Sequence, residues 1–258
     1  MVCSSENMLS MKDYPLDEND VVIVTYPRSG AAWSSELVSA IAHEADIEEI
    51  EAVPLEHRVS WLEMDYRYIP EDSFIHPSQS TNPQAKKRIW FSHLHFEHLP
   101  LATQQGKCKV IYVARNPKET ASSYCNFYRI TRDRELQRDL SFTDFFPIFT
   151  SGYIFGGNWF NHVRDYWKFC QNNPNATFLN FEDMKSNLTT VVEHLEEFID
   201  VPLTEDQRQR VVRHCSYRSM EGEARDWKNT FTVALNEAFD KLYNKKKEGL
   251  GLDFLFDY

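Results

Sequence analysis

A short polar segment follows the first apolar run of the chain. Residues 21–25 are apolar and β-branched, residues 26–30 read YPRSG, and residues 33–43 have the character of a helix. A loop between a buried strand and a helix directs backbone N–H groups and the positive end of the helix dipole at one point. The pattern therefore predicts a phosphate-sized or sulfate-sized anion site, with a purely structural turn as the alternative.

The side chains of this loop suit an anion. Arg28 supplies a fixed charge with planar donors, Gly30 allows close approach of the backbone, and small Ala31 and Ala32 leave room. The segment is not a Walker A loop, because GxxxxGK[ST] is absent.

A second group of candidate residues comprises His93, His95 and His98. An imidazole with an ordinary pKa near 6.5 suits a general base at neutral pH, although a lone histidine can equally be a packed or a surface residue. The i, i+2, i+5 spacing fits no standard zinc motif, so we expect no metal site.

Further segments alternate between strand and helix. Residues 110–114 predict a buried strand, and Asn116-Pro117 predicts the start of a helix that runs to about Phe127. Residues 177–181 predict another strand, and residues 188–199 have apolar side chains at helical spacing. Such alternation favours an α/β fold with a central parallel sheet flanked by helices.

The remaining segments fit one domain. Residues 143–149 and 159–170 predict aromatic-rich amphipathic helices, and Lys245–Lys247 predicts a solvated helix face. With no internal repeat and no Gly/Ser-rich linker, we expect a short N-terminal extension at 1–19 and a single domain at 20–258.

Composition excludes several classes of protein. Lys and Arg number 28 against 39 Asp and Glu, and the net charge of −11 disfavours nonspecific attraction to nucleic acid or anionic membrane. No apolar run is long enough to span a bilayer and the start does not read as a signal peptide, so we expect a cytoplasmic protein. The 5 cysteines form no CxxC pair and indicate neither a disulfide framework nor a zinc site.

The motif segments share their order with one known family. Residues 20–33, DVVIVTYPRSGAAW, resemble the 5′-phosphosulfate loop of the cytosolic sulfotransferases, whose usual form is TYPKSGTTW. Residues 91–94 (FSHL), 110–123 (VIYVARNPKETASS), 181–184 (FEDM) and 226–229 (DWKN) resemble later segments of that family in the same order. Ordered agreement of this kind is far more specific than any one motif.

The resemblance implies the sulfuryl donor 3′-phosphoadenosine 5′-phosphosulfate, no metal, and a role for each matching residue. It implies His93 as the catalytic base and Arg28 as the group that stabilises charge on the bridging oxygen. The donor-binding residues that it implies are Arg28, Ser29, Gly30, Ala31, Ala32 and Trp33 in the loop, Arg115 and Ser123 at the 3′-phosphate, Phe181 and Tyr217 beside Trp33 at the adenine, and Gly222.

The chain departs from the family pattern at several positions. Arg28 replaces a lysine and Ala31-Ala32 a threonine pair; Met220-Glu221 stands where many members carry Arg-Lys, and Phe91 where many carry lysine. A guanidinium is a poor proton donor, and each lost neutral hydrogen bond costs about 0.5–1.5 kcal/mol. These departures motivate an alternative, a non-catalytic sulfotransferase-like binding or regulatory protein.

Two further expectations come from the resemblance. Lys228, Thr232, Val233 and Glu237 reproduce the spacing KxxxTVxxxE of the family's dimerisation motif, which predicts a small-interface homodimer. The family also implies transfer to a hydroxyl or amine of a small, mostly apolar acceptor, which the aromatic loops would line. A nucleotide kinase is a more distant alternative, since no acidic pair is placed to position magnesium.

Overall fold

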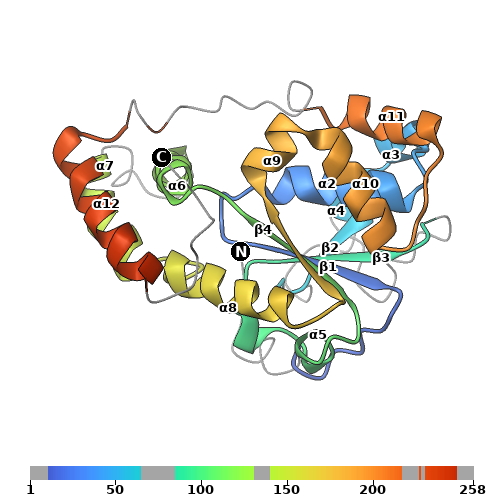
Figure 1. Cartoon of the computed structure of the whole chain (residues 1–258), viewed down its shortest axis with the longest axis horizontal. Coiled ribbons are helices and arrows are strands. Elements are labelled where there is room, and N and C mark those ends of the chain that lie inside the picture. Colours follow the sequence, from blue (N-terminus) through green and yellow to red (C-terminus); the bar gives the residue numbers. More distant parts are fainter. Residues whose placement is uncertain (1–10, 65–84, 131–139, 217–226, 228–229, 249–258) are drawn as a thin grey trace.

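The computed structural model describes residues 11–64, 85–130, 140–216, 227 and 230–248. A 5-stranded sheet with the order β2-β3-β1-β4-β5 forms its centre, and each neighbouring pair is parallel (Figure 1). The strands are β1 Asp20–Thr25, β2 Val59–Trp61, β3 Arg88–Ser92, β4 Lys109–Ala114 and β5 Ala176–Asn180. This arrangement confirms the predicted α/β fold with a central parallel sheet.

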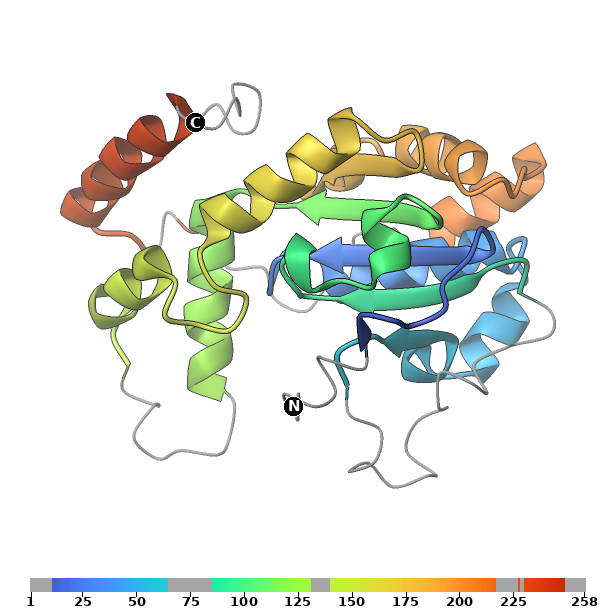
Figure 2. The same cartoon turned by 90° about the horizontal axis from the view of Figure 1, so that it is seen from below.

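Helices cover both faces of the sheet, and a third group stands beyond its carboxyl edge (Figures 1 and 2). One face carries α2 Ala31–Ala42, α3 Ile47–Ala52, α4 Leu55–Arg58, α9 Phe181–Ser186, α10 Leu188–Phe198 and α11 Glu205–His214. The other face carries η3 Phe96–His98, α5 Leu101–Gln104 and α8 Trp159–Gln171. Beyond the edge lie α6 Pro117–Ile130, α7 Phe142–Ser151 and α12 Val233–Glu248.

The central strands are apolar because both of their faces are covered. All residues of β1 are buried, with Val22 and Val24 in the core on the α8 side and Val21 and Ile23 in the core on the α2 side. A parallel strand covered on both faces reads as a continuous apolar run rather than an alternating one. That property is why the sequence predicts β1 and β4 almost to the residue.

Some predicted boundaries differ from the structure. The strand expected at 177–181 runs from 176 to 180, and Phe181 is the first residue of α9 instead of the last residue of a strand. An aromatic residue such as Phe181 is typical of a strand, which is why the sequence extends the strand to it. In the structure its ring packs in the core on the α2 side of the sheet. Among the described residues no helix is long and apolar enough to cross a membrane.

A buried lysine ties α6 to the C-terminal helix α12. Lys118 is 1% exposed; its Nζ lies 2.5 Å from Asp240 Oδ1 and donates to Asn236 Oδ1 at 2.7 Å. The same ammonium group stands 4.6 Å from the centre of the Trp227 ring. A buried charge needs such partners, because its desolvation would otherwise favour unfolding.

Replacing Lys118 should therefore loosen this end of the molecule. We expect Lys118→Met to lower the free energy of unfolding by about 2–4 kcal/mol, since charge-assisted hydrogen bonds and a buried ion pair are lost. Urea unfolding followed by circular dichroism measures the change. Lys245→Met on the exposed side of α12 is the matched control and should stay within about 0.5 kcal/mol of wild type. Equal effects of the two substitutions would contradict the role given to Lys118.

Candidate active site

The sheet brings the motif segments to one edge. The loop 26–30 follows β1, His93 follows β3, Arg115 follows β4 and Phe181 follows β5. All four strands are parallel and in register, with Val24 beside Ser92, Thr25 beside Val113, and Ala114 beside Asn180. Carboxyl ends of parallel strands are where α/β proteins bind ligands. Segments far apart in the sequence thus form one site.

The loop after β1 has an unusual backbone. Arg28 has a φ of 70° and Gly30 a φ of 104°, both in the left-handed region. Gly30 precedes the first residue of α2, and a Cβ at this position would lie 2.7 Å from Cδ2 of Phe181. Glycine is required here by both φ and space. The first N–H groups of α2 have no partner within the helix, so this end of the helix can bind an anion.

Two arginines meet beside this loop. Arg28 Nε donates to Ser123 Oγ at 3.2 Å, and an Arg115 guanidinium nitrogen donates to the Arg28 carbonyl oxygen at 3.2 Å. The Arg28 guanidinium stands 5.0 Å from the Phe127 ring centre, and that of Arg115 stands 4.5 Å from the Phe181 ring centre. Burial, followed by the charge of Arg115, lowers the pKa of Arg28. Two like charges held together favour an anionic ligand.

Arg115 carries a further sign of a ligand. Its other guanidinium nitrogen reaches Glu119 Oε2 at 3.3 Å, but its Nε is buried and has no hydrogen-bond partner among the described residues. Buried donors are nearly always satisfied in folded proteins, so an orphaned one points to a missing acceptor. A phosphate oxygen is such an acceptor.

His93 is held in one tautomer. Its side chain is nearly buried, at 9% exposed, and Nδ1 lies 2.8 Å from the Thr25 carbonyl oxygen and 3.3 Å from Thr25 Oγ1. A carbonyl oxygen only accepts, so the hydrogen of the neutral ring resides on Nδ1. Nε2 is then the nitrogen that can accept a proton from a substrate.

The pKa of His93 is far from the ordinary value that the sequence suggested. Burial lowers it to about 4; the bond to Thr25 opposes this shift, and the charge of Arg28 adds to it. Rings of Phe91, Trp61 and Phe155 surround the imidazole edge to face, with centres 4.7, 5.7 and 5.9 Å away. His93 is therefore neutral at neutral pH, the form that a general base requires.

Trp33 and Phe181, two of the residues expected at the adenine, pack together. Their ring centres are 5.2 Å apart in an edge-to-face arrangement, and Trp33 Nε1 donates to the Cys215 carbonyl oxygen at 2.8 Å. Their expected companion Tyr217 lies outside the described residues, as do Gly222 and the departure at 220–221.

The smaller loop residues divide between packing and exposure. Ser29 is fully buried, with Oγ 3.5 Å from Thr120 Oγ1 on α6. Ala31 is half-buried and Ala32 is exposed, so methyl groups stand at the surface where hydroxyls are usual in the family.

Two functional candidates escaped the sequence analysis. Glu63 is fully buried behind His93, and His162 is fully buried on α8 beside the same segment. The sequence does contain a signal for each of them. Glu63 is a single acid in the apolar run 61–64, and His162 lies on the apolar face of an amphipathic helix.

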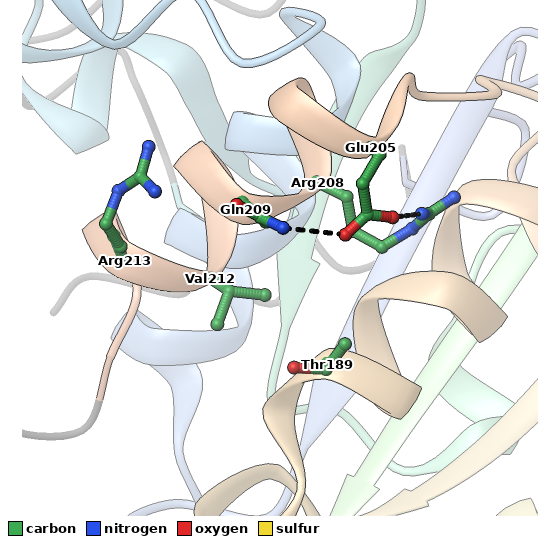
Figure 3. Close-up of a pocket in the computed structure, with 6 residues that line it drawn as sticks. All are labelled: Thr189, Glu205, Arg208, Gln209, Val212 and Arg213. Atoms are coloured by element: carbon green, nitrogen blue, oxygen red, sulfur yellow. Dashed lines mark hydrogen bonds and ion pairs between the residues drawn. The ribbon is translucent and has the colours of Figure 1, made fainter.

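Two cavities in the described part of the chain lie away from this site. One of about 230 Å³ lies between α10 and α11, at the far end of the molecule from α6, and Glu205 there accepts from Arg208 and Gln209 (Figures 1 and 3). The other, of about 380 Å³, is at the amino ends of β3 and β4, with Lys87 and Lys109 in its wall. Neither contains a motif residue.

The buried histidines predict a pH dependence of stability. Burial lowers the pKa of His162 to about 3, against an unfolded value near 6.5. At pH values between these two pKa values, His162 is therefore protonated in the unfolded chain and neutral in the folded chain. The stabilisation is complete above pH 6.5 and is lost as the pH falls.

Wild type should lose free energy of unfolding between pH 7 and pH 5, and we expect this loss to be smaller by roughly 1–2 kcal/mol in His162→Gln. Urea unfolding at the two pH values measures this difference. His98→Gln, at a site where the side chain is 46% exposed, should leave the difference unchanged. An unaltered pH dependence in His162→Gln would show that the imidazole is solvated in the folded protein.

Comparison with known proteins gives a consistent result. A family model described as the sulfotransferase domain matches residues 18–224. Sulfotransferase 1E1 of Bos taurus is 31% identical over 274 residues, covering 96% of this chain and 90% of the bovine protein. Sulfotransferase 1A1 of Canis lupus familiaris is 32% identical over 276 residues, covering 97% and 90%.

Solved structures agree with the sequence matches. Mouse sulfotransferase SULT7A1, complexed with PAP, superposes with a TM-score of 0.72 at 25% identity and covers 95% of this chain and 90% of its own. A putative steroid sulphotransferase of Arabidopsis thaliana gives a TM-score of 0.73 at 25% identity, with coverages of 96% and 83%. The family model and the near-complete relatives together show that this chain belongs to the sulfotransferase family.

Proposed function

We propose that this protein transfers the sulfuryl group of 3′-phosphoadenosine 5′-phosphosulfate to a hydroxyl or amine of a small, mostly apolar acceptor. Membership of the sulfotransferase family supports sulfuryl transfer in general. The observation that carries the finer proposal is the convergence of Arg28, Arg115 and Ser123 within a few ångströms of one another, at the same sheet edge as His93.

The donor fits the groups at this edge. The α2 amino end and Arg28 suit the 5′-phosphosulfate, and Ser123 and the buried Nε of Arg115 suit the 3′-phosphate. Phe181 and Trp33 offer apolar rings for the adenine. The mouse relative, whose structure is described as complexed with PAP, the donor's product, supports the same nucleotide here.

The reaction needs a base on one side of the sulfur and charge stabilisation on the other. Nε2 of His93 takes the proton of the acceptor hydroxyl while the new O–S bond forms. The bond from sulfur to the 5′-phosphate oxygen breaks, and the charge left on that phosphate is stabilised by Arg28 and the α2 amides. Arg28 stabilises this charge without giving up a proton, because a guanidinium stays charged.

The surroundings of His93 support the proposed acceptor class. Trp61, Phe91 and Phe155 pack around the imidazole, and the hydroxyl of Tyr124 donates to the Phe155 carbonyl oxygen at 2.8 Å. A base enclosed by aromatic rings suits an acceptor whose reactive oxygen or nitrogen sits on an apolar body.

The homodimer and the cytoplasmic location remain proposals. Val233 is 76% exposed, and Thr232 and Glu237 are exposed, as an interface motif requires, while Lys228 lies outside the described residues. The non-catalytic alternative is kept as an outcome of the experiment below.

Substitution of His93 tests the proposed chemistry. Wild type should transfer sulfur-35 from labelled donor to at least one member of a panel of phenols, steroids and amines. His93→Ala should bind adenosine 3′,5′-bisphosphate with an unchanged Kd in calorimetry but transfer at least about 100-fold more slowly, since a general base contributes 10²–10⁴-fold. His98→Ala, at an exposed position, should behave like wild type. Wild type that neither transfers nor binds the bisphosphate would favour the non-catalytic alternative.

Substitution of Arg28 tests its role at the leaving phosphate. Arg28→Lys keeps the charge and introduces a group that can donate a proton, so we expect kcat to rise roughly tenfold. Arg28→Ala should weaken binding of the bisphosphate by about 10–100-fold, because a charged hydrogen bond is worth about 1.5–3 kcal/mol. Single-turnover rates with saturating donor separate the two effects. A lysine variant no faster than wild type would place proton donation elsewhere.

A further inference from the structure

Two buried side chains hold the peptide groups of His93 from opposite sides. The His93 N–H donates to Oε1 of Glu63 at 2.6 Å, and Nε2 of His162 lies 3.2 Å from the His93 carbonyl oxygen. Glu63 and His162 are both 0% exposed. Neither contact involves the imidazole of His93, so both act on the backbone that carries it.

The fold explains how Glu63 reaches His93. Strand β2 pairs with β3 in parallel, with Trp61 beside Phe91, and the Leu62 N–H donates to the Phe91 carbonyl oxygen at 2.9 Å. Two residues further along each chain, Glu63 stands beside His93. The carboxylate thus takes over the hydrogen bonding of the strand where the ladder ends.

The orientation of His162 is fixed by a tyrosine. The hydroxyl of Tyr112 lies 2.8 Å from His162 Nδ1. Because the His93 carbonyl oxygen can only accept, Nε2 of the neutral His162 carries the hydrogen, and Tyr112 donates to Nδ1. This chain of bonds runs from β4 through α8 to His93.

The neighbouring residue is held in the same way. The Leu94 N–H donates to Ser92 Oγ at 3.0 Å, and the Tyr166 hydroxyl donates to the Leu94 carbonyl oxygen at 2.7 Å. Because the peptide groups are fixed and Nδ1 is bound to Thr25, the imidazole ring of His93 is held in one orientation, and so is its Nε2. A catalytic group needs support of this kind, since small errors in its placement cost rate.

We propose that Glu63 and His162 are positioning residues for His93, which clamp its N–H and its carbonyl group and so aim Nε2 at the acceptor. This inference rests on the proposed role of His93 as the base. Neither residue touches a reacting atom, so their removal should lower kcat while the KM values for donor and acceptor stay within about twofold.

Glu63 should also give the reaction a pH dependence. Burial raises its pKa to about 7, against the opposing hydrogen bonds from the His93 backbone and from Trp61 and Ser92. The titratable groups nearest to it are His93, the residue after β3, and Tyr166 on α8, with His162 on α8 across the His93 peptide. Burial keeps both imidazoles and the phenol in their neutral forms at neutral pH. Of these groups, Glu63 is the one that changes charge between pH 6 and 8.

Matched pairs of variants test the clamp. Glu63→Gln keeps an acceptor oxygen for the His93 N–H, whereas Glu63→Ala removes it; His162→Gln keeps a donor near the position of Nε2, whereas His162→Leu removes it. We expect the alanine and leucine variants to lose 10–100-fold in kcat and the glutamine variants to keep at least a third of it. In wild type kcat should rise through pH 7 by no more than about threefold as Glu63 ionises, since the neutral amide of Glu63→Gln retains at least a third of it, and in Glu63→Gln that rise should be absent.

A spectroscopic measurement decides the contact independently of turnover. In protein labelled with nitrogen-15 histidine, the His93 amide proton should resonate downfield and titrate with a midpoint near pH 7, and this titration should vanish in Glu63→Gln. If wild type shows the titration but no transfer, the proposed function fails while the contact stands. An amide that does not titrate in wild type, or a Glu63→Ala variant with wild-type kcat, would overturn the inference.

Discussion

Parallel pairing of β1 with both β3 and β4 is the constraint on which the site depends. Three segments that lie about 20 to 90 residues apart in the sequence reach one edge because their strands run in one direction and in fixed register. A shift of one residue in either pairing would turn alternate side chains to the other face and move the Thr25 carbonyl away from His93. The apolar side chains that fill both cores fix this register, so packing holds the chemical groups in place.

Burial does opposite things at the two halves of the site. Around His93, aromatic rings and buried neighbours remove water, lower the pKa of the imidazole and keep it neutral. Beside the loop after β1, the guanidinium groups of Arg28 and Arg115 lie close together, supported by aromatic faces and by Ser123. A neutral imidazole and a pair of positive guanidinium groups therefore lie at the same edge of the sheet. The net charge of the whole protein is −11. The local arrangement, rather than the overall charge, decides which ligand the site favours.

Most of the departures from the family pattern lie in segments that we propose to bind the donor, whereas Phe91 packs against His93. Arg28 keeps the charge of the usual lysine but cannot act as a proton donor, and Ala31 and Ala32 leave binding to backbone amides. The base side is fully supported, since both hydrogen-bonding groups of the His93 peptide and its Nδ1 have buried partners. This asymmetry is what we expect of an enzyme in which the proposed base keeps its supporting contacts while the proposed contacts to the donor phosphates are altered.

The sequence by itself determined the strands β1 and β4, the loop between β1 and α2 and the identity of most charged groups around it, because a buried parallel strand and a loop before a helix have strong local signatures. It did not predict β2, β3 or α11: β2 has only 3 residues, β3 (RIWFS) begins with a charged residue and ends with a polar one, and α11 (EDQRQRVVRH) has too few apolar residues for a periodic signal. Only the tertiary structure brought Glu63 and His162 to His93, fixed the tautomer of His93 and lowered its pKa. Those properties arise from contacts between residues about 30 to 70 positions apart and from the exclusion of water, neither of which local sequence encodes.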